Sequence, residues 1–258
     1  MRPWLSPAGS FEILDSSPEL WVVSKPAGWL THRTRIAPRE FGIVEVLSKQ
    51  LTGSYTEESL RPIHRLDRAT SGVLLIARTQ DAATLWGARL RERAVKKTYI
   101  AVVRGWCDDT GVIERELERN PGQNPAPACT RYQTLGRVEV PLALSSRYPT
   151  SRYSIVKVVP ETGKNHQIRK HFEGIRHPLI GDTIYGEGRH NRFFRSQYEF
   201  GHLALHARTL EWEDHLWQAQ IPASWGRFLN PWIAQLGLSP SWEENSGTEN
   251  LTNRPILR

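Results

Sequence analysis

The sequence predicts an α+β domain, because strand-like and helix-like segments follow one another without the strict strand–helix–strand alternation of a doubly wound sheet. The chain has 258 residues, of which 39% are hydrophobic and 24% are charged, as is usual for a globular protein with a sizeable core. We place the domain at residues 11–235, after a short loose leader. We expect the polar tail, residues 239–258, to be disordered.

Apolar runs and alternation predict the strands. Residues 12–28 form two short strands around a Ser-Ser-Pro turn, and residues 152–160 form another strand. The run "GVLLIAR", residues 72–78, is typical of a strand that is buried on both faces. Residues 97–105 alternate, with Tyr99 on the same face as the next alanine and valine.

Helical spacing predicts a first helix at residues 81–94. Its apolar side chains Leu85, Trp86 and Leu90 fall on one side, and Asp81 is placed to cap its N-terminus. This helix therefore packs one face against the sheet.

A second helix is predicted at residues 165–177. Its apolar residues recur at i, i+4 and i+7 from Ile168, so Arg169 and His166 lie off the buried stripe, able to point into a cleft. Residues 120–129, "NPGQNPAPAC", are rich in proline and predict a loop.

The chain is basic, with a formal net charge of +7. Residues 89–97 and 163–177 carry much of the excess, and both contain apolar residues at regular intervals, so they belong to the folded part. A basic folded protein of this size often binds a polyanion such as nucleic acid, although a merely basic surface fits the composition equally well.

Several classes of protein are disfavoured by the motifs. No apolar stretch approaches the roughly 20 residues that span a bilayer, and the N-terminus lacks a signal-peptide core, so we expect a cytoplasmic protein without a membrane. Cys107 and Cys129 are not in a CxxC motif, and we expect reduced thiols. Phosphate-binding loops and nucleophile elbows are absent.

A metal site is also disfavoured. His202 and His206 are four residues apart, a spacing that zinc can use on a helix. The leucines around them alternate as in a strand, and no acid or cysteine completes a ligand set. We therefore predict no metal.

The stretch "HRLDRATSG", residues 64–72, places Asp67 between Arg65 and Arg68, with Gly72 five residues after the acid. Two explanations are open. One is a surface salt bridge. The other is a catalytic carboxylate that neighbouring cations keep ionised at neutral pH.

Four stretches in order resemble the RluA-type pseudouridine synthases: residues 64–78, 96–105, 161–186 and 202–207. The likeness spans roughly residues 11 to 215. Within the family it is greatest to a tRNA-specific branch, through residues 25–34, 147–153 and 186–192.

The resemblance implies a pseudouridine synthase catalytic fold, with a mixed, mostly antiparallel sheet and flanking helices around a basic active-site cleft. It implies isomerisation of a uridine in tRNA, at position 65, without metal or cofactor, by a protein we expect to be monomeric. Three alternatives stay open: the same chemistry on rRNA or on both RNAs, a non-catalytic RNA-binding module, and a nucleosidase or glycosidase with one carboxylate, although glycosidases usually need two acids.

The resemblance also implies roles for individual residues. Asp67 acts at the sugar, Tyr99 stacks on the uracil and can help to remove the C5 proton, and Arg169, distant in sequence, is the partner of Asp67. Arg65 enters the space that the flipped base leaves, and Ile168 packs beneath the base. The remaining candidates for RNA contact are His64, Lys96, Lys97, Lys164, Lys170, His171 and Arg176.

Overall fold

The computed structural model describes residues 10–33, 40–52, 60–118, 122–145 and 148–237. Nearly all of the expected leader and all of the expected tail, residues 239–258, lie outside the described residues. The described elements run from Glu12 to Gln235.

The core of the fold is a ten-stranded sheet with the main order β1-β2-β4-β9-β5-β8-β7-β6, in which β3 also pairs with β4 and β10 with β9. The strands are β1 (Glu12–Ser16), β2 (Leu20–Lys25), β3 (Arg61–Pro62), β4 (Ser71–Ala77), β5 (Lys96–Arg104), β6 (Thr110–Glu118), β7 (Pro125–Val140), β8 (Ser151–Pro160), β9 (Leu205–Trp212) and β10 (His215–Gln218). All pairs between these strands are antiparallel except β4 with β9. The predicted α+β class with a mostly antiparallel sheet is confirmed.

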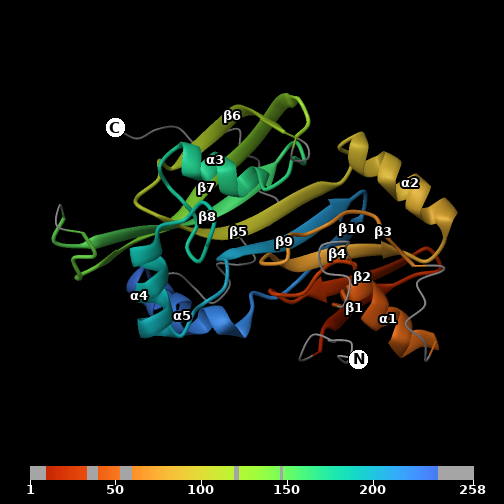
Figure 1. The fold of residues 1–258 in the computed structure, drawn as a ribbon, viewed down its shortest axis with the longest axis horizontal. Coiled ribbons are helices and arrows are strands. Elements are labelled where there is room, and N and C mark those ends of the chain that lie inside the picture. The colour runs from red at the N-terminus through yellow and green to blue at the C-terminus, as the bar shows by residue number, and fades with distance from the viewer. Residues whose placement is uncertain (1–9, 34–39, 53–59, 119–121, 146–147, 238–258) are drawn as a thin grey trace.

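Helices cover both faces of this sheet (Figure 1). They are α1 (Ile43–Thr52), α2 (Gln80–Arg91), α3 (Gln167–Gly174), α4 (Gly188–Tyr198) and α5 (Gly226–Gln235), with a short 3₁₀ turn at Ala223–Trp225. In β4, alternate side chains pack toward α1 and toward α2. In β5, alternate side chains pack toward α3 and toward α4 and α5. Because both faces are covered, residues 73–77 of β4 and residues 100–103 of β5 are continuously apolar.

The two antiparallel halves of the sheet meet where β4 lies parallel to β9, and this contact requires Gly72. The paired residues are Ser71 with His206 and Gly72 with Ala207. Gly72 has φ +116°, and a Cβ at this position would collide with the carbonyl oxygen of Ala207. Only glycine permits this approach, which places the segment before β4 beside β9.

A second irregularity lies at the same place. The register between β5 and β9 shifts after Thr98, so that Thr98 pairs with Thr209 but Tyr99 pairs with Ala207. A bulge of this kind redirects a side chain relative to the regular pleat. Tyr99 thereby reaches the apolar clusters of both halves, and Ala207 is its neighbour as well as that of Gly72.

The first predicted helix is present but differs in detail. It spans Gln80–Arg91, and the cap is Thr79, whose hydroxyl accepts a hydrogen bond from the Ala82 amide at 3.1 Å. The prediction of Asp81 as the cap is wrong, because Asp81 lies inside the first turn. Of the three predicted inward residues, Trp86 is buried and Leu90 packs against the same cluster, whereas Leu85 is 43% exposed and Ala82 takes its place on the buried side.

The prediction of a loop over residues 120–129 is wrong in its second half. Strand β7 begins at Pro125 and pairs there with β6, with Pro125 opposite Glu118 and Pro127 opposite Glu116. Pairing with β8 starts only at Thr130. Because the first residues of β7 have a partner strand on one side only, prolines without an amide hydrogen are tolerated there.

No helix within the described residues is long and apolar enough to cross a membrane. Cys107 and Cys129 are both free. In the described part of the chain no group of three or more histidine, cysteine or acidic side chains could hold a metal ion.

Of the two histidines with zinc-like spacing, His202 precedes β9 and His206 lies within it. His206 is 1% exposed in β9, and both of its ring nitrogens are used within the protein. Nε2 donates to the Ala219 carbonyl at 3.2 Å, and Nδ1 accepts from the Ser71 hydroxyl at 2.8 Å. Burial lowers the pKa of His206 to about 4, so the ring is neutral at pH 7.

Because His206 is neutral in the folded protein, we predict that acid destabilises the fold. Between the usual value of 6.5 and about 4 the unfolded chain binds a proton at His206 that the folded chain does not, so the free energy of unfolding falls as pH falls through this window. The full contribution is of the order of 3 kcal/mol. We expect His206→Gln to flatten the dependence of stability on pH between 6.5 and 4 in urea unfolding. An unchanged pH profile would show that the ring does not titrate with folding.

Candidate active site

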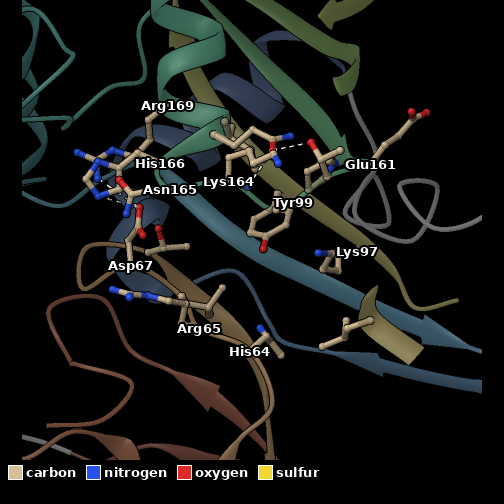
Figure 2. A pocket seen from close by; sticks show the side chains of 18 of the residues that line it. His64, Arg65, Asp67, Lys97, Tyr99, Glu161, Lys164, Asn165, His166 and Arg169 are labelled. Atoms are coloured by element: carbon tan, nitrogen blue, oxygen red, sulfur yellow. Dashed lines mark hydrogen bonds and ion pairs between the residues drawn. The ribbon is translucent and has the colours of Figure 1, made fainter. Parts of the chain in front are cut away.

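A cavity of about 640 Å³ opens above the junction of the two half-sheets. Its walls are the loop before β4 (residues 63–70), the end of α2 with the residues after it, β5, and the segment 160–169 that leads into α3. Figure 2 shows polar side chains of the loop before β4, of β5 and of the segment 160–169 around this cavity. The cavity therefore gathers segments from both halves of the chain.

Asp67 lies in this cavity, and its partner is Arg169. Nη1 of Arg169 lies 3.3 Å from Oδ2 of Asp67, and Nε2 of His166 lies 3.7 Å from the same oxygen (Figure 2). The Asp67 side chain is 22% exposed, and among the described residues Oδ1 has no hydrogen-bond partner. Arg169 holds one oxygen, with His166 close by, while the other oxygen remains available in the cavity.

Arg169 is itself fixed by a buried carboxylate. Its Nε and Nη2 donate to the two oxygens of Asp182 at 2.7 and 2.8 Å, a bidentate pair in which the Asp182 side chain is fully buried. Asp182 also accepts from the amides of Ile184 and Tyr185 at 2.9 and 3.0 Å. Burial alone would raise the pKa of Asp182, but Arg169 and these two amides together lower it. This planar arrangement aims the third nitrogen of Arg169 at Asp67.

The arginines next to Asp67 in sequence do not pair with it. Arg68 forms an ion pair with Glu40 at 2.8 Å and donates to the Gly28 carbonyl at 3.0 Å. Arg65 lines the cavity and forms no ion pair with any described residue. The explanation of Asp67 as a surface salt bridge with its neighbours is therefore not supported.

Two residues that the sequence analysis did not single out hold the loop of Asp67 in place. The buried ammonium of Lys25 donates to three carbonyls, those of Pro26, Trp29 and Arg68, at 2.9, 2.8 and 3.3 Å. The Thr31 hydroxyl donates to the carbonyl of the residue before Asp67 and accepts from the amide of the same residue. Burial lowers the pKa of Lys25 to about 7, more than the charge of Asp67 raises it. The sequence feature that could have identified Lys25 is its position directly before a Pro-Ala-Gly turn.

Tyr99 lies between the Asp67 side of the cavity and Lys97 (Figure 2). Burial, and secondarily the Asp67 charge, raise the pKa of its phenol above the ordinary value. The hydroxyl therefore stays protonated at neutral pH. This weighs against a phenolate acting as a base and leaves stacking and hydrogen bonding as its functions.

His166 connects Asp67 to Tyr185. The Tyr185 hydroxyl lies 3.2 Å from Nδ1 of His166, so that the hydroxyl can donate and Nε2 carries the hydrogen toward Asp67. Burial lowers the pKa of His166 more than Asp67 raises it, which keeps the ring neutral at pH 7. His166 has φ +52° and directly precedes α3, which explains why the helix starts at Gln167 and not at residue 165.

Five of the predicted RNA-contacting residues line the cavity: His64, Arg65, Lys97, Lys164 and Ile168. Ile168 is 7% exposed and belongs at once to the cavity wall and to the core beneath α3. His64 accepts a hydrogen bond from the Leu75 amide at 3.1 Å, and burial, followed by the Lys97 charge, lowers its pKa to about 3. The ring is therefore neutral, and its hydrogen bond to Leu75 stabilises the loop before β4.

The other predicted contacts lie elsewhere. His171 is fully buried, with Nδ1 2.9 Å from the Thr130 hydroxyl, so it cannot reach a phosphate and that prediction is wrong. Lys96 pairs with Glu211 at 3.4 Å outside the cavity. Lys170 and Arg176 do not line the cavity either.

Comparison with known proteins defines the class. A family model of RNA pseudouridylate synthases matches residues 19–174. The chain is similar to tRNA pseudouridine synthase C of Pectobacterium carotovorum (38% identity, 92% of this chain and 65% of the relative). It is similar to tRNA pseudouridine synthase C of Yersinia pestis (36% identity, 88% of this chain and 91% of the relative). The chain thus spans slightly under two thirds of the Pectobacterium relative.

Solved structures agree with this result. Human RNA pseudouridylate synthase domain containing 4 superposes with a TM-score of 0.63 at 23% identity, covering 84% of this chain and 92% of that one. Human RNA pseudouridylate synthase domain containing 1 gives 0.61 at 26% identity, covering 84% and 86%. The chain belongs to the RNA pseudouridylate synthase family, in its RluA-type branch. The enzyme class is accordingly that of an RNA pseudouridine synthase.

The two carboxylates that contact Arg169 differ in burial, which predicts different costs of removal. Asp182→Asn leaves a buried guanidinium without its bidentate partner, and we expect a loss of about 3 kcal/mol in the free energy of unfolding. Asp67→Asn removes a partly exposed contact, and we expect a loss below about 1 kcal/mol. Urea unfolding of both variants measures the difference. Equal losses would make Asp67 a structural residue.

Proposed function

We propose that the protein converts a uridine of tRNA to pseudouridine, with the Asp67 carboxylate acting at C1′ of the target nucleotide. The observation that carries the proposal is the geometry of Asp67: one oxygen is held by Arg169 and the other faces the cavity. The names of the similar proteins support tRNA as the substrate. We assign uridine 65 as the target and the cytoplasm as the location.

The conversion of uridine to pseudouridine requires one carboxylate at the sugar. The N1–C1′ bond breaks, the uracil turns, a C5–C1′ bond forms, and the proton on C5 is exchanged for one on N1. Positive charge develops at the sugar when the first bond breaks, as in glycoside cleavage, and a carboxylate stabilises or traps it. Both the route through attack at C1′ and the route through a glycal need an ionised carboxylate. No electron is transferred, so we expect no metal or cofactor.

The other cavity residues have complementary functions in this proposal. Tyr99 stacks on the uracil as a neutral phenol, and its hydroxyl donates a hydrogen bond as the base turns. Ile168 supplies the apolar surface beneath the ring. These two side chains hold the detached uracil close to C1′ until the new bond forms.

Arg65 is placed to enter the RNA. The target base must leave its stack to reach Asp67, which costs a few kcal/mol. Arg65 is exposed at the rim of the cavity and makes no ion pair in the described structure. A planar guanidinium can stack in the vacated space and hydrogen-bond to the bases that remain. Because one chain supplies all four described walls of the cavity, we propose that the protein acts as a monomer.

Asp67→Asn tests the assignment of the carboxylate. The amide is nearly isosteric, and the cationic rim is unchanged, so we expect pseudouridine formation to be lost while tRNA affinity stays within a few-fold of wild type. The measurement is pseudouridine in a tRNA transcript under single-turnover conditions, together with the dissociation constant. An rRNA transcript serves as the second substrate. Activity on rRNA alone would favour the rRNA alternative, and activity that falls only as much as affinity would contradict a catalytic Asp67.

A further inference from the structure

The rim of the cavity carries cations that have no carboxylate partner. Among the described residues, five arginines and lysines that line the cavity form no ion pair: Arg65, Arg91, Arg93, Lys97 and Lys164. The acids at the cavity are Asp67, which is held by Arg169, and Glu161, which is paired with Arg131 at 2.5 Å and also feels the charge of Arg93 without forming an ion pair with it. Unpaired charges facing one cavity are available to an incoming anion.

Two of these cations, Arg91 and Arg93, come from the end of α2, a segment that the likeness to the family did not single out. Arg91 is the last residue of α2, and Arg93 follows the cap residue. Both side chains are exposed and line the same cavity as Lys164. Arginines at a helix C-terminus also complement the helix dipole, so charge alone does not separate a binding function from a structural one.

The backbone conformation of Arg93 distinguishes a binding function from a structural one. Its φ is +61°, in the left-handed region, and the Arg93 and Ala94 amides donate to the carbonyls of Leu90 and Arg89 at 3.3 and 2.9 Å. This is a Schellman C-terminus, in which glycine is the favoured residue at the position of Arg93. An arginine here lowers stability relative to glycine, and the helix gains nothing from it that Arg89 and Arg91 do not already supply.

We propose that Arg91 and Arg93 bind the phosphate backbone of the RNA strand next to the flipped uridine, so that the end of α2 forms one wall of the RNA site and Lys164 lies on the other. Lys97 joins the two walls at the inner end. A Cβ added to Gly163 would lie 4.0 Å from the Lys97 ammonium. The inference rests on the proposed function, because it assumes that RNA enters this cavity.

The chain contains a matched comparison. Arg176 follows α3 with φ +63°, and the amides of Arg176 and His177 donate to Glu173 and Phe172 in the same Schellman pattern. Arg176, although predicted from the sequence as an RNA contact, does not line the cavity, and it therefore serves as the comparison. Arg93→Gly and Arg176→Gly therefore remove the same charge and relieve the same backbone strain at two different places.

The experiment measures melting temperature and tRNA affinity for both glycine variants. We expect both melting temperatures to rise by about 1–3 °C. We expect Arg93→Gly to weaken tRNA binding by roughly three- to tenfold at low salt, clearly more than Arg176→Gly. It should also reduce the slope of log affinity against log salt by about 0.7 to 0.9, the value for one phosphate contact.

Two further variants keep the test independent of folding at the helix end. Arg91→Ala retains helical backbone and should weaken binding by a similar factor, whereas Arg93→Lys should bind within about twofold of wild type. If Arg93→Gly binds no more weakly than Arg176→Gly while the wild type still forms pseudouridine in that tRNA, the inference fails and the proposed function stands. A wild type that neither binds nor modifies RNA overturns both.

Discussion

The guanidinium of Arg169 connects the two halves of the molecule, and the site depends on it. It comes from α3, in the half built on β5 to β8, and contacts Asp67 in the loop before β4, in the other half. Asp182 occupies its other edge through two hydrogen bonds and is itself fixed by backbone amides. A charge that is fully buried with its partner has one low-energy orientation. The direction of Asp67 is therefore set by a residue that RNA does not need to touch.

Main-chain geometry brings these groups within reach. Gly72 lets β4 approach β9, and the register shift after Thr98 places Tyr99 at the same junction. Neither feature contributes chemistry, but together they bring the loop of Asp67 and Tyr99 to the same junction, beside Ala207. Lys25 and Thr31 then hold the loop of Asp67 against the turn that follows β2. The loop that carries Asp67 is thus hydrogen-bonded by the side chains of both Lys25 and Thr31.

Much of this arrangement could be predicted from the sequence. Continuous apolar runs indicated the central strands, and the motif around Asp67 indicated the carboxylate. The partners of Arg169 beyond Asp67 could not be predicted, because nothing local marks Asp182 as the acid that a buried guanidinium must have. His171 and Ile168 lie three residues apart on α3, and only the packing of β7 shows that the former is buried without access to RNA. Arg93 was hidden for a different reason: its left-handed backbone is visible only in the structure.

The central claim, that Arg169 aims Asp67 rather than merely neutralising it, is tested most directly by Arg169→Lys. A lysine keeps the charge but cannot bind both oxygens of Asp182 and reach Asp67 with a fixed third donor. The measurement is the single-turnover rate constant of pseudouridine formation, compared with the dissociation constant for the same tRNA. The account predicts a fall of about 100-fold or more in the rate constant, with affinity within a few-fold of wild type. A rate constant close to wild type, or one that falls only in proportion to affinity, would contradict it.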